Sequence, residues 1–163
     1  MPAEVPRAKS VVERIFLDSN VLLYAYSETD PEKRQIARGL ADEHGAVVST
    51  QVLSEFANVV LRKFRMPSPE ARRRIAELAA RCDVIAVTPA VVMEAIHVHE
   101  RFGFSFFDSQ IVAAALVSGA TTLYSEDLQH GQRIDGKLRI VSPFTPAAQQ
   151  RRGRYRVRRP VRS

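Results

Sequence analysis

Short apolar segments alternate with helical patterns along most of this 163-residue chain, and this alternation restricts its fold more than any other feature. Each apolar segment is followed by a stretch in which apolar residues recur at helical spacing. That order is typical of a parallel sheet with helices on both faces. We expect strands at residues 14–17, 46–49, 84–87, 122–124 and 138–141.

Helices are predicted between these strands. The patterns place them from residue 21, over 32–43, from 50 to 64, over 70–81, from 88 to 101, and over 111–118. The helices at 50–64 and 70–81 flank a short Pro-rich turn and form a helical hairpin, with Ser68 as the expected cap of the second helix.

One predicted helix combines an apolar surface with an acid at its start. Residues 111–118 are apolar almost all round, so this helix belongs in the interior. Ser105 is placed to cap the segment that opens it, and Asp108 stands three residues later. Gly119 is placed to end the helix. A carboxylate drawn inward in this way needs a hydrogen-bonding or positively charged partner.

Three further acids fall at the same edge of the predicted sheet. Asp18 follows the first strand, Asp127 follows the fourth, and Glu55 lies one turn into the helix after the second. Each alone is readily explained as a helix cap or a solvated border residue. With Asp108 they would repel one another, unless a hard cation such as Mg²⁺ or Mn²⁺ joined them.

The strings around these acids resemble the four signatures of the PIN-domain nucleases, and within them the VapC-type toxins of bacterial toxin–antitoxin pairs. The resemblance covers roughly residues 14–142 and is carried by residues 16–24, 53–56, 106–111 and 123–128. It implies an α/β, three-layer α/β/α fold with a short, mostly parallel central sheet and a protruding helical hairpin.

The resemblance also implies a function. It predicts a Mg²⁺- or Mn²⁺-dependent endoribonuclease with a VapB-type antitoxin as partner, acting as a homodimer. The implied metal-site acids, which are also the implied catalytic residues, are Asp18, Glu55, Asp108 and Asp127. Asn20 and Ser125 match polar helpers near the metal, and Glu126 competes with Asp127 for the fourth acidic position. We prefer Asp127, because Ser125-Glu126-Asp127 matches the family's Ser/Thr-x-Asp pattern.

Other functions stay open at this point. A housekeeping RNA-processing nuclease would carry the same acids, and a non-cleaving RNA- or protein-binding module would keep the fold. A phosphatase with Asp18 as nucleophile, as in haloacid-dehalogenase-like enzymes, would usually have a second Asp where this chain has Asn20.

Composition indicates the cellular compartment of the protein and suggests three segments in the chain. No segment suits a secretory signal or a membrane span, and the single cysteine, Cys82, fits a reducing cytoplasm. We expect a flexible lead-in at 1–13, the nuclease-like domain at 14–142, and an Arg-rich, disordered tail at 143–163. That tail is an RNA-binding arm, an end without a role, or a flap over the protein's own acids. The predicted hairpin is also rich in arginine and is either a solvated face or an RNA- or antitoxin-contacting surface.

Overall fold

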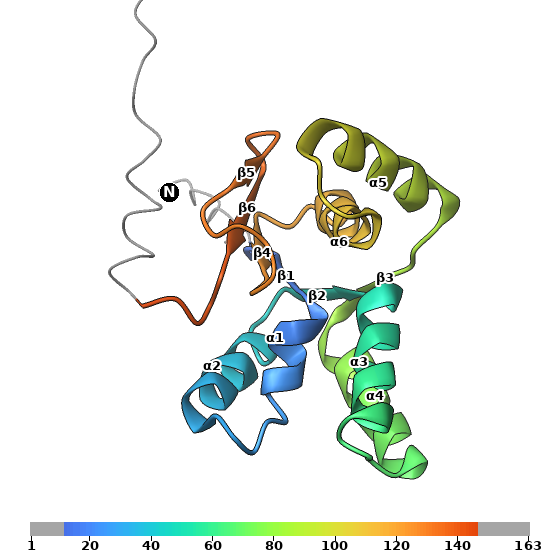
Figure 1. Ribbon diagram of the computed structural model, residues 1–163, viewed down its shortest axis with the longest axis vertical. Helices are drawn as coiled ribbons and strands as arrows, with labels where there is room; N and C mark the ends of the chain where they lie inside the picture. Colours follow the sequence, from blue (N-terminus) through green and yellow to red (C-terminus); the bar gives the residue numbers. More distant parts are fainter. Residues whose placement is uncertain (1–11, 147–163) are drawn as a thin grey trace, which may run out of the picture.

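A six-stranded sheet runs through the centre of the computed structural model, which describes residues 12–146 (Figure 1). The strand order is β3-β2-β1-β4-β6-β5. The strands are β1 (Ile15–Leu17), β2 (Ala46–Ser49), β3 (Asp83–Ile85), β4 (Thr122–Tyr124), β5 (Arg133–Ile134) and β6 (Leu138–Val141). Our expectations for residues 1–11 and 147–163 lie outside the described residues.

The fully buried strand β1 lies between two parallel neighbours. It pairs with β2 on one side and with β4 on the other, in a register that sets Leu17 beside Tyr124. The chain steps outward from β1 to β3 and then returns across the sheet to β4. In parallel sheets, sites form at the carboxyl edge where the strand order reverses in this way. Here that edge follows β1 and β4.

Helices cover both faces of the sheet. Figure 1 shows α5 and α6 on one side and the first four helices on the other, where α3 and α4 project as a hairpin. The helices are α1 (Ser19–Tyr24), α2 (Pro31–Ala41), α3 (Thr50–Arg62), α4 (Ser68–Arg81), α5 (Pro89–Phe102) and α6 (Phe106–Val117). The expected three-layer α/β fold is therefore confirmed. Within the described part of the chain, no helix combines the length and the apolar composition that a membrane crossing requires.

Two local expectations were wrong. Ser68 does not cap α4; it is the first helical residue, and Pro67 precedes it without a side-chain cap. The two prolines flanking Ser68 hold the backbone at the helix start, so no side-chain cap is needed there. The strand β5 was not expected, because a strand of two residues is too short to show an alternating apolar pattern in the sequence. It pairs antiparallel with β6 through a turn at Asp135 and Gly136, both with positive φ.

The helix α6 forms the centre of the core on its side of the sheet. Its residues Ser109–Ala115 are all buried, and α5 packs against it. Both of its ends are as predicted: Ser105 accepts a hydrogen bond from the Asp108 amide, and Gly119 follows the last turn with a φ of 74°. Alanine side chains allow neighbouring elements to approach α6 closely.

We expect Ala114→Leu to lower the free energy of unfolding by about 1–3 kcal/mol, because Ala114 is fully buried and the added atoms overpack the core. Val117→Leu on the same helix is the matched control. Val117 is 57% exposed, and its replacement should change stability by less than about 0.5 kcal/mol. Urea denaturation measures both, and equal effects would contradict the assignment of α6 to the core.

Candidate active site

The candidate site begins where β1 and β4 end side by side. The amide of Asp18 donates to the carbonyl oxygen of Tyr124 at 3.0 Å, which extends the strand pairing by one step. Asp18 then caps α1 and accepts from the Ser19 amide at 2.7 Å. Ser125, the first residue after β4, donates its hydroxyl to the other oxygen of Asp18 at 2.7 Å. The register of the two strands thus brings Ser125 onto Asp18.

Asp18 is a buried acid. Only 5% of the residue is exposed. Burial raises the pKa of its carboxyl to about 6, while the bonds from Ser125 and Ser19 lower it and the charges of Glu55 and Asp127 raise it further. The interior therefore disfavours a charged Asp18 unless a cation is present.

Glu55 is held on the α1 side of the same site. One of its oxygens accepts from the Ser19 hydroxyl at 2.7 Å. The other accepts from the side-chain amide of Gln51 at 2.8 Å, and Gln51 lies one turn earlier on α3. Residues four apart share a helix face, so Gln51 orients the carboxylate.

Asp127 and Glu126 are adjacent but take different partners. Asp127 accepts from the side-chain amide of Asn20 at 2.9 Å, and its own amide donates to Ser125 Oγ at 3.3 Å. Glu126 forms an ion pair with Lys33 at 2.9 Å. That ion pair neutralises Glu126, so the contacts favour Asp127 as the fourth acid.

Asp108 comes from the other face of the sheet. Its carboxylate accepts from the Ser105 hydroxyl at 2.8 Å, a reciprocal cap within the first turn of α6. The start of α6 is nonetheless tied to α3, because Gln51 donates to the carbonyl oxygen of Phe107 at 3.2 Å and accepts from Gln110 at 2.6 Å. Asp108 is only half-buried, so it is less buried than the apolar helix after it led us to expect.

A continuous hydrogen-bond network therefore joins three of the four acids, while Asp108 stands beside it. Within residues 12–146, no three acids, histidines or cysteines are set close enough to hold a metal ion by themselves. The members of the network, in order, are Gln110, Gln51, Glu55, Ser19, Asp18, Ser125, Asp127 and Asn20.

The chemistry of this network fits a hard divalent cation. Every acceptor around Asp18 is oxygen, and none of the four acids forms an ion pair with a basic side chain in the described residues. Mg²⁺ keeps several waters and commonly needs only one or two protein carboxylates. Asp18 with Glu55 or Asp127 would supply that number of carboxylates, whereas no group of three or more acids gathers within residues 12–146.

The sequence analysis missed the residues that connect the acids. Ser19, Gln51, Gln110 and Lys33 were not singled out. The first two and Lys33 each donate to a carboxylate, and Gln110 donates to Gln51. The four-residue spacing of Gln51 and Glu55 was the one available signal. Gln110 sits in an apolar helix at 7% exposure, so its amide needed a partner that the sequence does not identify.

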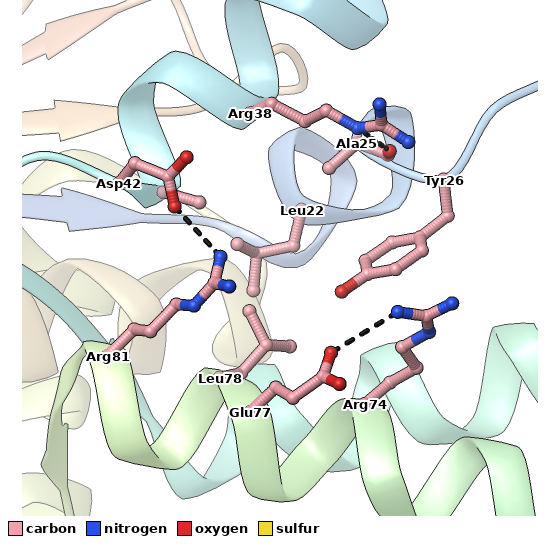
Figure 2. Close-up of a pocket in the computed structure, with 10 residues that line it drawn as sticks. Leu22, Ala25, Tyr26, Arg38, Asp42, Arg74, Glu77, Leu78 and Arg81 are labelled. Atoms are coloured by element: carbon pink, nitrogen blue, oxygen red, sulfur yellow. Dashed lines mark hydrogen bonds and ion pairs between the residues drawn. The ribbon is translucent and has the colours of Figure 1, made fainter.

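A cavity of about 200 Å³ lies away from the acids, between α1, α2 and α4 (Figure 2). Leu22 and Leu78 line it. Arg81 pairs with Asp42 at 2.9 Å and Arg74 with Glu77 at 3.2 Å. These two hairpin arginines are therefore partnered by acids, which favours a structural role for them.

Comparison with known proteins places the chain in a family. The family model described as PIN domain matches residues 15–136. No curated protein sequence matches the chain.

Several solved structures share the fold. A toxin–antitoxin complex from Klebsiella pneumoniae has a TM-score of 0.61 at 16% identity, over 80% of this chain and 98% of that one. VapC20 of Mycobacterium tuberculosis, a Sarcin-Ricin loop cleaving toxin, has a TM-score of 0.57 at 22% identity, over 69% and 89%. VapBC2 from Rickettsia felis, bound to a promoter DNA fragment, has a TM-score of 0.55 at 18% identity, over 78% and 98%.

We expect Asp18→Asn to stabilise the metal-free protein at pH 7.5, by up to about 3 kcal/mol. The raised pKa means that the folded chain binds this proton more tightly than the unfolded chain does. The free energy of unfolding of the wild type should therefore fall as the pH rises from about 4 to about 6, and the variant should lack this fall.

Chemical denaturation in EDTA across that pH range measures the difference. Glu28→Gln, at an exposed acid, is the control and should follow the wild type. A constant difference between wild type and Asp18→Asn at all pH values would contradict a buried, proton-binding Asp18.

Proposed function

Because the chain belongs to the PIN-domain family, we propose that it is a divalent-metal-dependent endoribonuclease and the toxin of a type II toxin–antitoxin pair. One observation carries the proposal: a buried Asp18, held by two donors and flanked by Glu55 and Asp127, lacks a basic partner in the described chain. VapC20 among the structural neighbours is described as a Sarcin-Ricin loop cleaving toxin, which supports a cleaving activity for this chain.

Each residue of the network would have a separate task. Asp18 would hold Mg²⁺ or Mn²⁺ through the lone pairs that Ser19 and Ser125 leave free, and Glu55 or Asp127 would complete the protein ligands. The bound ion would lower the pKa of a water molecule and offset negative charge on the phosphodiester. Asn20 would keep Asp127 in position, and Gln51 would do the same for Glu55.

Asp108 would act from the start of α6. Its bond to Ser105 fixes the carboxylate at the helix N-terminus, near the Gln51 relay to Glu55. A water molecule between Asp108 and the network would bring this fourth acid into the reaction.

Partners follow from the same proposal. A groove of about 250 Å³ adjoins the acids, and its lining includes Asn20 and Tyr24 of α1, Val59 of α3, and Phe64 just after α3. A segment of a VapB-type antitoxin would fit this partly apolar groove, and two neighbours are toxin–antitoxin assemblies by their descriptions. We further propose that the chain acts as a homodimer in the cytoplasm.

Removing one acid should abolish most of the cleavage. We expect Asp18→Asn, Asp108→Asn and Asp127→Asn each to lower the rate of RNA cleavage in Mg²⁺ at least about a hundredfold, because each removes a carboxylate that would hold or position the metal ion, whose positive charge would stabilise the transition state. Glu126→Gln is the matched control for Asp127→Asn, since Glu126 is paired with Lys33, and it should retain cleavage within about tenfold.

The measurement is a digest of labelled RNA with and without Mg²⁺. Full cleavage by the Asp108→Asn protein would show that Asp108 takes no part in the reaction. If the wild type leaves the RNA full length, the protein is a non-cleaving binding module and not a nuclease.

Metal binding is testable without cleavage. We expect Mg²⁺ or Mn²⁺ to raise the unfolding temperature of the wild type, with a stabilisation of about 2.7 kcal/mol at a hundred times the dissociation constant. The rise should be larger at pH 7.5 than at pH 5, because protonated Asp18 is a poor ligand. Asp18→Asn should lose the rise, whereas Glu126→Gln should keep it. Equal rises in both variants would place the ion elsewhere.

A further inference from the structure

The sheet has one polar, open face over β4, β6 and β5. Along β4 and β6, the buried residues Leu123 and Ile140 alternate with half-buried ones. Successive side chains of a strand point to opposite sides, so the half-buried set shares one face. Figure 1 shows no helix of the described chain to the left of β5 and β6. This face borders a cavity of about 370 Å³, whose lining includes Thr122, Tyr124, Arg139 and Val141.

Three basic side chains line this cavity, namely Arg133, Lys137 and Arg139. Within residues 12–146, none of them forms an ion pair with an acid. Arg133 donates to the carbonyl oxygen of Gly136, at the long distance of 3.4 Å. The charges of the three side chains are therefore available to an anionic ligand.

The acids near this cavity do not cancel its positive charge. Asp135, in the turn between β5 and β6, is paired with Arg101 of α5. Glu13 lines the cavity and accepts a hydrogen bond from the Thr121 hydroxyl at 2.8 Å. Three cations against one lining acid leave the cavity with a net positive charge.

Two of these arginines face each other across the sheet. Arg133 of β5 stands directly opposite Arg139 of β6 in the antiparallel register. Side chains at such positions start about 4.5–5.5 Å apart, and like charges there destabilise the pair of strands. An anion between the two guanidinium groups would offset this repulsion, and guanidinium binds phosphate through two parallel hydrogen bonds. The pair of arginines therefore favours a phosphate ligand, just as the buried Asp18 favours a cation.

The cavity reaches the edge of the sheet that carries the acids. Tyr124, which lines it, accepts the hydrogen bond from the Asp18 amide. Arg139 stands beside Thr122 in the parallel register, three residues before Ser125. At about 3.3 Å per residue, the backbone of Arg139 lies about 10 Å along the sheet from the level of Ser125. A polyanion bound to both arginines can therefore extend to the acids.

We propose that this cavity binds the phosphate backbone of the RNA substrate on one side of the scissile bond, through Arg133, Lys137 and Arg139. The inference rests on the proposed function for the identity of its ligand. Basic groups of this kind bind nucleic acid by replacing the counterions of its phosphates. The position beside the acids favours RNA over an acidic protein segment, because the same phosphate chain would continue to the metal site.

The test compares full-length proteins by their affinity for a fluorescein-labelled, unstructured 20-nucleotide RNA in EDTA. One variant combines Arg133→Gln, Lys137→Gln and Arg139→Gln. If each side chain binds one phosphate, the affinity of the wild type should fall about 20-fold more between 50 and 200 mM salt than that of the triple variant. Glu13→Gln, which removes the lining acid, should instead tighten RNA binding.

The matched control removes three charges elsewhere. Arg62→Gln, Arg65→Gln and Arg72→Gln alter exposed arginines of the hairpin that likewise form no ion pair in the described chain. This second triple variant should keep most of the salt dependence. An equal loss in both triple variants would show that net charge governs binding, and it would overturn the cavity as a site.

A single substitution separates binding from folding. Arg133→Glu places opposite charges across β5 and β6, so its unfolding temperature should equal or exceed that of the wild type. The same change puts an acid into the cavity, so this variant should bind RNA more weakly than Arg133→Gln does. Wild-type affinity for RNA in the Arg133→Glu protein would overturn the proposal.

Cleavage of the same RNA in Mg²⁺ is scored separately from binding. If the triple variant of the cavity loses salt-dependent binding but the wild type does not cleave, the nuclease is refuted and the RNA-binding cavity stands. If the wild type cleaves and the triple variant binds RNA unchanged, only this inference is refuted. An oligo-glutamate peptide that competes with the RNA at equal charge concentration would replace RNA by an acidic protein segment as the ligand.

Discussion

The parallel pairing of β1 with β4 is the constraint on which the candidate site depends. It continues one residue past the strands, through the bond from the Asp18 amide to Tyr124, and so aligns Asp18 with Ser125. A slip of one residue would turn Asp18 to the other face of the sheet. The buried residues Phe16 and Leu123, paired across these strands, hold the register from within the core. The hydrophobic core therefore positions the acid.

This arrangement has an energetic consequence. Because burial raises the pKa of Asp18 to about 6, keeping its carboxyl charged at neutral pH costs free energy. This cost lowers the stability of the folded chain. The bonds from Ser19 and Ser125 reduce the cost without removing it, since burial outweighs them. Strain of this kind at one residue is common where a ligand is to be bound, because the ligand relieves it. Stability and binding are thus coupled through Asp18.

Sequence reasoning was strongest where a pattern is long or repeated. The alternation of strands and helices gave the layers, and the caps of α6 followed from Ser105 and Gly119 alone. It failed where too few residues carry the signal, as at β5, or where two prolines fix a helix start that a serine was expected to cap.

The sequence predicts which edge of the sheet holds the site, but it does not predict the contacts within the site. Parallel strands bring Asp18 and Asp127 to one edge for a reason visible in the sequence. The bonds through Ser19 and Gln51 depend on rotamers, and rotamers depend on tertiary packing. The same limit applies to Asp108: its spacing from Ser105 predicts a cap, and the cap is what the carboxylate forms. Whether it also serves a metal is not encoded in that spacing.

Asn20 helps to distinguish a metal-binding site from the site of a phosphotransferase. A phosphotransferase that used Asp18 as nucleophile would need a carboxylate oxygen free to attack, and it would usually have an acid two residues later. Here both oxygens of Asp18 accept short hydrogen bonds within a buried site. The side chain two residues later is an amide that donates to Asp127 and accepts from the Glu126 amide. An aspartate at position 20 would repel Asp127 and lose the donated bond. Asn20 thus keeps a second carboxylate beside Asp18, an arrangement suited to a shared cation.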